Sequence, residues 1–362
     1  MNIAIDTKQS YFCKKNAVNN IQQKISNLVA LGEELKSNQT FKLAIENAQY
    51  KNNWFTEAFV QYSVDAIITQ FLQKEKLEKW LANYPTLTSY HSSKTLGIIM
   101  AGNIPLVGFH DFLCAYLAGV STQVKMSSKD DELFQIVLQI FSTIDESVLA
   151  QFKLVERLEK IDLVIATGSD NTHRYFEQYF ASIPRLLRKS RTSVAILNGE
   201  ESTADLDLLA DDIFLYFGMG CRNISQIFVP ENYDITRLFP HFEKKYKWLH
   251  HHSKYMNNYD YLRAILLLNR EPHFANEFIM LLENNGAMQT GIAKLQYSYY
   301  ADSALLEQHL MENIDKLQVV ATNKTLVTPA IQAITTNFGN CQLPALNDYP
   351  DGVDILDFLL KN

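Results

Sequence analysis

The sequence predicts an α/β protein built on a doubly wound parallel sheet. From Leu96 onward, short β-rich runs alternate with longer segments of helical spacing. Repeated strand–helix–strand units form parallel sheets with right-handed crossovers. The chain also has 362 residues, more than twice the usual size of one domain, so two packed domains are expected.

The N-terminal region, residues 1 to about 90, is predicted to be helical. Apolar residues recur there at the period of an amphipathic helix, beginning at Ile21, Ile25 and Leu28 and again from Phe59 to Leu81. We expect the chain to divide into three parts. They are residues 1–197, residues 198–338, and a tail of residues 339–362 that serves docking or oligomerisation.

Four segments after this region are predicted strands of one sheet, with helices between them. Ligands of such sheets bind beyond the carboxyl ends of the strands, so the loops at those ends are the first place to look for a site. The strands are Leu96–Met100, Ser121–Lys125, Ile161–Ala166 and Thr192–Leu197, and the helices lie near Leu106–Ala118, Asp130–Ile144 and Asn171–Phe180.

Small and polar residues gather in the loops at the carboxyl ends. Turns favour Gly, Asn and Ser, so any one of these loops has a simple structural explanation. Together they predict a crevice lined by small residues, hydroxyls, an amide and an ammonium group. No G-x-G-x-x-G sequence is present, so a Rossmann-type grip on a pyrophosphate is not indicated. The loops are Ala101-Gly102-Asn103-Ile104-Pro105, Lys125-Met126-Ser127-Ser128, Thr167-Gly168-Ser169 and Asn198-Gly199.

Cys221 is the candidate nucleophile. It follows a helical segment, Thr203 to Phe217, and two nearby glycines, and it precedes an apolar run, Ile224 to Val229, that is typical of a strand. Glycines let the backbone approach a ligand closely, and the charge of Arg222 favours a thiolate. The alternative is a small buried hydrophobic residue. The other cysteines, Cys13, Cys114 and Cys341, lack the glycine-flanked turn.

Composition excludes several other classes of protein. A net charge of -7 and a pI near 5.7 argue against nucleic acid as a main partner, but not against a small anionic cofactor.

The four cysteines match no zinc pattern, and their wide spacing together with the lack of a signal peptide predicts a cytoplasmic protein. The apolar stretch Gly97–Val120 contains Asn103, His110 and Asp111, so we expect a buried strand and helix rather than a membrane span.

A histidine run, His250-His251-His252, is the one sequence feature that suggests a metal site. Adjacent side chains on a helix or strand point in different directions, and no carboxylate or cysteine accompanies them at ligand spacing. We therefore expect a solvated run and no metal.

The order of the motifs resembles the aldehyde dehydrogenase superfamily, and within it the acyl-CoA reductase family of the LuxC type. The resemblance runs from about Leu96 to Pro230. It implies an aldehyde dehydrogenase-like fold, with a Rossmann-like NAD(P)-binding domain inside residues 1–197 and an α/β catalytic domain in residues 198–338. The motifs match the family's Pro-Trp-Asn-Phe-Pro loop, Lys-Pro-Ser-Glu strand end, Thr-Gly-Ser turn and cysteine, in that order, at Gly102-Asn103-Ile104-Pro105, Lys125-Met126-Ser127-Ser128, Thr167-Gly168-Ser169 and Cys221.

The resemblance also implies roles for single residues. Cys221 is the nucleophile, and Asn103 helps to bind the oxyanion. Ser128 stands where the family has a glutamate at the adenosine ribose, and Lys129 follows it, so we expect NADPH as the cofactor, with NADH as the alternative. The implied cofactor-binding residues are Gly102, Lys125, Ser127, Ser128, Thr167, Gly168, Ser169 and Leu197.

One departure from the superfamily bears on the reaction. The general base of the dehydrogenases' Glu-Leu-Gly-Gly motif aligns with Ile196, and a general base contributes ~10² to 10⁴-fold to a hydrolytic step. We therefore expect an acyl-CoA reductase that forms an acyl-thioester on cysteine and reduces it to a fatty aldehyde. The alternatives are an aldehyde dehydrogenase that makes the acid and a non-catalytic acyl-carrier subunit. The donor is acyl-CoA or an acyl-protein, a partner acyl-protein synthetase or transferase is implied, and a homo-oligomer is expected.

Overall fold

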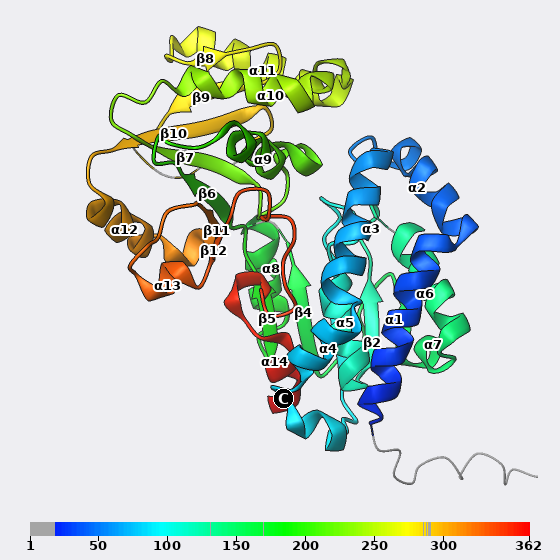
Figure 1. The fold of residues 1–362 in the computed structure, drawn as a ribbon. Helices are drawn as coiled ribbons and strands as arrows, with labels where there is room; N and C mark the ends of the chain where they lie inside the picture. The colour runs from blue at the N-terminus through cyan, green and yellow to red at the C-terminus, as the bar shows by residue number, and fades with distance from the viewer. Residues whose placement is uncertain (1–18, 131, 169, 285, 287, 289–290) are drawn as a thin grey trace, which may run out of the picture.

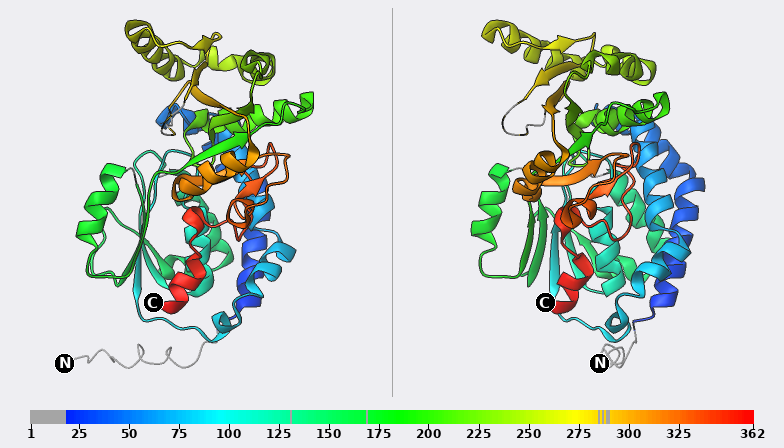
Figure 2. Two further views of the ribbon diagram at one scale, coloured as in Figure 1. Left: turned by 90° about the vertical axis from the view of Figure 1, so that its left-hand side faces the viewer. Right: turned by 60° about the vertical axis from the view of Figure 1, so that its left-hand side comes forward.

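The computed structural model describes residues 19–362 except 131, 169, 285, 287, 289 and 290. It contains two sheets that belong to two domains (Figure 1). The N-terminal helices and the C-terminal helix lie with the first sheet, and the chain from β6 to β12 builds the second domain (Figure 2).

The first sheet has five parallel strands in the order β3-β2-β1-β4-β5. Leu96 of the central strand pairs with Thr122 on one side and with Leu163 on the other. The strands are β1 (Thr95–Ile99), β2 (Ser121–Lys125), β3 (Phe152–Leu154), β4 (Leu163–Thr167) and β5 (Arg185–Arg188). The helices that connect them are α5 (Phe109–Ala118), α6 (Glu132–Ile144), α7 (Ser147–Gln151) and α8 (Asp170–Tyr179).

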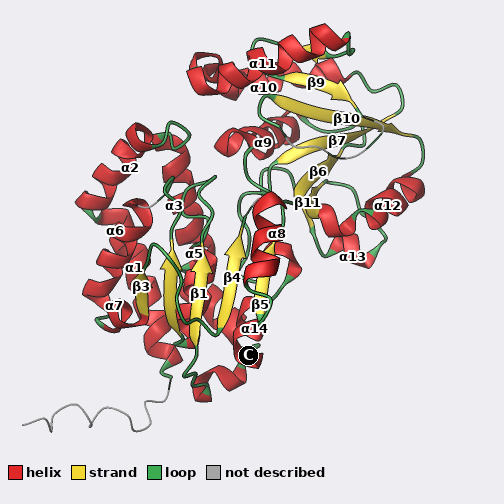
Figure 3. Cartoon of the chain, turned by 180° about the vertical axis from the view of Figure 1, so that it is seen from behind, coloured by secondary structure: helices red, strands yellow, loops and turns green. Residues whose placement is uncertain are grey.

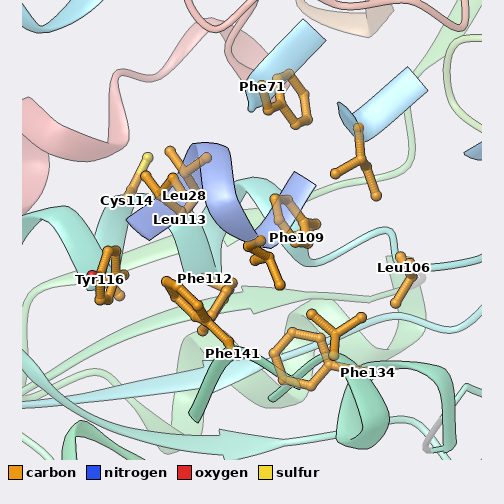
Figure 4. Close-up of a cluster of buried hydrophobic side chains, with 14 of the residues drawn as sticks. Leu28, Phe71, Leu106, Phe109, Phe112, Leu113, Cys114, Tyr116, Phe134 and Phe141 are labelled. Atoms are coloured by element: carbon orange, nitrogen blue, oxygen red, sulfur yellow. The ribbon is translucent and has the colours of Figure 1, made fainter. Parts of the chain in front are cut away.

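Helix α5 forms the centre of the first domain's core, and all ten of its residues are buried. Figure 4 shows Phe109 and Phe112 of this helix among side chains that include Phe134 and Phe141 of α6. The apolar stretch expected to be a buried strand and helix is therefore β1, a loop and α5. None of the helices among the described residues is both long enough and apolar enough to span a membrane.

The N-terminal helices begin at side-chain caps. Asn20, Asn38 and Thr56 each accept a backbone N–H two or three residues into the helix that follows, which satisfies donors left free at a helix start. The helices α1 and α2 pack against α6. Their bounds are α1 (Ile21–Ser37), α2 (Gln39–Lys51), α3 (Glu57–Phe71) and α4 (Lys74–Leu81), followed by the 3₁₀ helix η1 (Pro85–Ser89).

The second sheet has the order β12-β11-β6-β7-β10-β9-β8, and only the β8–β9 pair is antiparallel. Its strands are β6 (Thr192–Ile196), β7 (Ile224–Pro230), β8 (Phe274–Ala275), β9 (Met280–Glu283), β10 (Lys294–Tyr300), β11 (Leu317–Ala321) and β12 (Thr335–Thr336). Its helices are α9 (Thr203–Phe214), α10 (Phe239–Tyr246), α11 (Ser253–Asn269), α12 (Ser303–Glu312) and α13 (Pro329–Gln332). Short 3₁₀ helices are η2 (Leu215–Gly218), η3 (Ile235–Leu238), η4 (Lys247–His251) and η5 (Ile314–Lys316).

The strand expected at Thr192–Leu197 forms as β6, but its expected place in the first sheet is wrong. It lies between β11 and β7 of the second sheet. The chain therefore changes sheets between Arg188 and Thr192, a few residues before the expected division at 197 and 198. A strand's own sequence does not identify its neighbours, because pairing partners lie far away in the chain.

The C-terminal tail crosses back from the second domain to the first. It contains η6 (Pro350–Gly352) and ends in α14 (Ile355–Lys361), which packs against α5. In Figure 1 this segment is red and runs between the two domains. Tyr84 donates to the carboxylate of Asp354 at 2.6 Å, and Tyr90 donates to the carbonyl of Leu359 at 2.6 Å.

Candidate active site

A cavity of about 700 Å³ contains the candidate site. Strands β1 and β4 point their carboxyl ends toward the second domain (Figure 3). Residues of the loops that follow these ends line part of the cavity. We call one set of lining residues the strand-end wall and another set the arginine wall. The strand-end wall comprises Gly102–Pro105, Ser127, Lys129, Thr167 and Gly168; the arginine wall comprises Arg188, Arg191 and Arg222 with Asp111, Asp351 and Asp348.

The strand-end wall depends on glycine for the close approach of two loops. A Cβ placed on Gly102 would lie 2.6 Å from the Cβ of Ser127, which is too short for any real contact. A Cβ on Gly168 would lie 3.0 Å from the Cβ of Thr172 at the start of α8. These two glycines therefore serve the packing of the loops, and the hydroxyl of Ser127 and the side chain of Thr167 form the lining beside them.

Asn103 bridges the loop after β1 to the loop that carries the cysteine. Its amide nitrogen donates to the carbonyl of Met219 at 2.9 Å. That bond uses one of two amide hydrogens. The loop itself is fastened from two sides: Asp130 accepts the N–H of Leu106 at 2.6 Å, and Ser63 of α3 donates to the carbonyl of Pro105 at 2.8 Å.

The cysteine loop is anchored by a buried amide. Asn223, which is 2% exposed, accepts the N–H of Gly220 at 2.8 Å and donates to the carbonyl of Leu215 at 2.8 Å and to that of Asp212 at 3.1 Å. The carbonyl of Cys221 accepts a hydrogen bond from Ser193 at 2.8 Å. Cys221 itself is exposed and lines the cavity. The loop thus presents the thiol to the cavity on a fixed backbone.

Three consecutive left-handed residues precede this loop. Tyr216, Phe217 and Gly218 have φ values of 54°, 59° and 73°, a conformation that costs non-glycine residues of the order of 1–3 kcal/mol each. Buried aromatic packing stabilises it. The ring of Phe217 lies 4.9 Å from that of Trp54 and 5.0 Å from that of Phe59, so the N-terminal helical region helps to hold the cysteine loop.

The pKa of the Cys221 thiol reflects opposing effects. Burial within the protein raises the pKa of the thiol above its usual value, although Cys221 as a residue is exposed and lines the cavity. Arg222 lowers that pKa, Asp351 raises it and Arg188 lowers it. The expectation that Arg222 favours the thiolate thus has the right sign, but desolvation is larger.

The arginine wall consists of three ion pairs. Arg188 and Asp111 form a bidentate pair, with N–O distances of 2.7 and 2.6 Å. Arg191 lies 3.2 Å from a carboxylate oxygen of Asp351. Arg222 lies 3.9 Å from a carboxylate oxygen of Asp348 and donates to the carbonyl of Cys341. Among the described residues that line the cavity, every carboxylate is therefore engaged by an arginine.

Asp212 fastens the C-terminal tail to the cysteine loop. Its carboxylate accepts the N–H of Gly339 at 2.6 Å and that of Cys341 at 3.0 Å, and its own carbonyl accepts Asn223. The side chain is 1% exposed. Burial raises the pKa of Asp212 to about 6, against the lowering effect of the two N–H groups.

The structure brings most of the residues implied by the resemblance to one cavity. Cys221, Asn103, Gly102, Ser127, Thr167 and Gly168 all line it. Lys125 and Ser128 lie beside it and are exposed, and Lys125 donates to the carbonyl of Glu156 at 2.8 Å. Ser169 lies outside the described residues.

Leu197 and Ile196 are not among the residues that line the cavity, and both are buried inside the second domain. Leu197 is fully buried in the second domain, where its N–H donates to Phe228 and its carbonyl accepts Tyr300. Ile196 lies in another buried cluster of that domain. The loop Asn198-Gly199 is likewise absent from the lining residues. Ile196 is therefore not placed beside Cys221 in the cavity, and its alignment with a general base stays a prediction. Arg188 is the residue that ends β5 at the cavity.

Sequence reasoning missed the arginine wall, Asn223 and Asp212. The segment Arg188-Lys189-Ser190-Arg191 is the one local signal for the wall, since a cluster of cations between two strands is unusual in an acidic protein. Nothing local marks Asn223 or Asp212, because their partners are backbone groups of other segments.

The other cysteines are buried where they are described, and the expected solvated histidine run holds for two of its three residues. Cys114 and Cys341 are buried, and burial raises the pKa of each thiol well above its usual value. Cys13 lies outside the described residues. His250 and His251 are exposed, whereas His252 caps α11. The described residues contain no cluster that could hold a metal ion.

A sequence profile of the acyl-CoA reductase (LuxC) family matches residues 16–238. This match covers more than half of the chain. The chain belongs to the acyl-CoA reductase (LuxC) family. No curated protein is similar enough to this chain to count as a relative.

Solved structures similar to this one are aldehyde dehydrogenases. An aldehyde dehydrogenase of Physcomitrella patens in complex with the reaction product succinate has a TM-score of 0.64 at 11% identity, covering 94% of this chain and 84% of that one. A Mycobacterium tuberculosis aldehyde dehydrogenase complexed with NAD⁺ has a TM-score of 0.58 at 13% identity, covering 86% and 75%. An NAD-dependent benzaldehyde dehydrogenase of Corynebacterium glutamicum has a TM-score of 0.58 at 12% identity, covering 83% and 76%. The protein therefore has the aldehyde dehydrogenase fold, and family and fold together indicate an oxidoreductase acting on aldehydes or acyl-CoA.

Proposed function

We propose that this protein is an acyl-CoA reductase that forms an acyl-thioester on Cys221 and reduces it with NADPH to a fatty aldehyde. The observation that carries the proposal is the pairing of charges around the thiol. Each described carboxylate of the cavity lining is bound by an arginine. Carboxylate oxygens that already face a guanidinium, as in Asp111 and Asp351, are poorly placed to accept a proton from a water molecule as well, so an acyl-enzyme here would be protected from hydrolysis and available for reduction.

The first step uses the cysteine loop and Asn103. The thiolate of Cys221 attacks the thioester carbonyl of an acyl-CoA, a new C–S bond forms, and coenzyme A leaves as its thiolate. The second amide hydrogen of Asn103 and the backbone N–H of Cys221 would donate to the oxyanion that develops on the carbonyl oxygen. The fixed loop supports this role, because Asn103 is already bonded to the carbonyl of Met219, two residues before the cysteine.

The strand-end wall fits a reduced nicotinamide dinucleotide. Its described part offers hydroxyls from Ser127 and Thr167 and an ammonium group from Lys129, which suit ribose and phosphate oxygens. Lys125 and Ser128 would extend the site along the cofactor. When bound, NADPH would supply a hydride to the carbonyl carbon of the Cys221 thioester, and a proton from solvent would complete the hemithioacetal. Collapse of the hemithioacetal returns the thiol and releases aldehyde.

An apolar side of the cavity supports an apolar acyl chain as substrate. Ala66, Ile67 and Phe71 of α3 line it together with Leu106 and Phe109. Contact with such side chains stabilises buried hydrocarbon by about 0.8 kcal/mol per CH₂. The donor is acyl-CoA or an acylated partner protein.

The test is a reaction in both directions. With acyl-CoA and NADPH, we expect an aldehyde to form and free coenzyme A to appear in equal amount. With aldehyde and NADP⁺ but no coenzyme A, we expect little acid. Fast acid formation together with no reduction of acyl-CoA would favour an aldehyde dehydrogenase, and acylation without turnover by either reduced cofactor would favour an acyl carrier.

A further inference from the structure

Helix α3 presents one largely apolar face to the cavity. We call the four lining residues of this face the α3 stripe: Ser63, Ala66, Ile67 and Phe71. Helical residues three or four positions apart lie on the same face. The stripe extends over eight positions of the helix, from Ser63 to Phe71, which corresponds to about 12 Å along the helix axis. It therefore offers an extended surface to a ligand, not a single point of contact.

The Ser63 end of the stripe lies beside the proposed reacting groups. Ser63 donates to the carbonyl of Pro105 at 2.8 Å. Pro105 belongs to the loop of Asn103, whose side-chain amide donates to the carbonyl of Met219 in the cysteine loop at 2.9 Å. Cys221 of that loop lines the same cavity. An acyl group on Cys221 would therefore begin at this end of α3.

The Phe71 end of the stripe is closed by aromatic rings. The ring of Phe71 lies 5.3 Å from that of His110 and 6.5 Å from the nearly parallel ring of Phe109 (Figure 4). His110 is itself held by a hydrogen bond from its Nε2 to the carbonyl of Leu346 in the C-terminal tail, at 3.0 Å. Close-packed side chains of this kind are costly to displace. A hydrocarbon chain that runs along α3 would therefore meet a fixed end at Phe71.

We propose that Phe71 is the specificity-determining residue for acyl chain length, and that Ala66 keeps the α3 stripe open to the chain. The proposal rests on the proposed function, since it takes Cys221 as the site of the acyl group. Ala66 has the smallest side chain of the stripe, so a larger residue there would fill space that the chain needs. Each CH₂ that contacts the stripe strengthens binding about fourfold, whereas one that has to displace Phe71 gains nothing.

The test is the binding of saturated fatty acids, from butanoate to hexadecanoate, to the full-length protein. Each acid competes with a fluorescent fatty acid, so the assay needs no turnover. For the wild type we expect affinity to rise about fourfold per CH₂ up to a limiting length and to rise no further beyond it. Phe71→Ala should move this limit to longer acids, and Ala66→Leu should move it to shorter ones.

Two neighbouring isoleucines of α3 provide a matched pair. Ile67 lines the cavity, whereas Ile68 is absent from the lining residues, is 1% exposed and packs toward Gly32 of α1. Ile67→Ala should weaken the binding of longer acids more than that of the shortest ones. Ile68→Ala should lower the melting temperature and leave the dependence on chain length unchanged. The pair separates lost contact with the chain from general loss of packing.

The proposal fails if the limiting length is unchanged in the folded Ala66 and Phe71 variants, with Phe71→Leu as the milder change if Phe71→Ala does not fold. It also fails if the wild type binds none of the acids or binds all lengths equally. Reduction of acyl-CoA by the wild type is measured separately. If the acids show the expected limit but no aldehyde forms, the chain-length site stands and the proposed reduction fails.

Discussion

The two walls of the cavity are assembled in different ways. The strand-end wall comes from loops that directly follow β1, β2 and β4. Gly102 and Ser127, in the loops after the neighbouring strands β1 and β2, lie so close together that a side chain on Gly102 would collide with Ser127. The arginine wall comes from segments that are distant in the chain: Arg188 and Asp111 are 77 residues apart. Strand order is enough to build the first wall and to place Arg188 opposite Thr167, whereas the ion-pair partners of the arginines come from distant segments of the chain.

The walls also differ in what they offer a ligand. The strand-end wall presents uncharged hydroxyls, an amide and an exposed lysine, which can bind and orient. The arginine wall presents carboxylates that are already paired. The two sets of residues meet where Arg188 donates to Thr167 at 3.4 Å, so the charged groups adjoin the residues that would bind a ligand, and Cys221 lines the same cavity.

Replacing Cys221 by Ala removes the proposed nucleophile. Aldehyde formation from acyl-CoA should fall by on the order of 10³-fold or more, because the covalent step is lost, while NADPH binding should persist. Cys114→Ala is the control, since Cys114 lies in the apolar core around α5 (Figure 4) and should leave acylation in place. Acyl transfer to Cys114 in the Cys221 variant would show that the nucleophile is misassigned.

Replacing Asn103 by Ala tests the strand-end wall as an oxyanion site. Acylation measured by rapid mixing should slow by ~10²-fold, with little change in the melting temperature, because the Asn103 side chain is exposed. If Asn103 only ties down the loop through its bond to Met219, stability and rate will fall together. That result would remove Asn103 from the proposed chemistry.

Replacing Ser128 by Glu tests whether the loop after β2 contacts the adenosine ribose of the cofactor. A carboxylate there would repel a 2′-phosphate, so the KM for NADPH should rise by about tenfold, while the KM for NADH should change little. Steady-state kinetics with both cofactors measure this. Equal effects on NADPH and NADH, or a wild-type enzyme that strongly prefers NADH, would place this loop away from the ribose.

Replacing Asp212 by Asn tests how the C-terminal tail is held against the cysteine loop. The folded-state pKa of Asp212 is about 6, above the unfolded value of about 3.9. Its contribution to stability is therefore complete below pH 4 and is lost as the pH rises through 6. Relative to the Asn variant, the wild type should lose about 1 kcal/mol between pH 5 and 7, measured by urea unfolding. Parallel stability profiles would mean that Asp212 does not titrate in this range.

Much of the strand-end wall was predictable because its signals are local. The expected strand Ser121–Lys125 has the bounds of β2, and the loops after β1, β2 and β4 gather at one cavity as parallel topology requires. Asn103 and Cys221 also line that cavity together. These residues lie beside glycines in short loops, where a few neighbouring positions decide the backbone.

The arginine wall was not predictable for the opposite reason. Arg188 and Arg191 differ from ordinary surface arginines only through partners on α5 and in the C-terminal tail. Strand β6 belongs to the second sheet because it pairs with β11 and β7. These partners are distant in the chain, so the sequence prediction assigned Ile196 and Leu197 to the wrong sheet. Asn223 is recognisable as an anchor only once the carbonyls of α9 lie around it.

The most direct test of the account is the mass of the intact protein after mixing with acyl-CoA. We expect the wild type to gain one acyl group and to keep it in buffer, because the carboxylates of the cavity are paired. Addition of NADPH should then remove the group as aldehyde. Cys221→Ala should gain no acyl group. An acyl group that is lost in buffer at the same rate with and without NADPH would contradict the central claim that this cavity reduces a thioester and protects it from water.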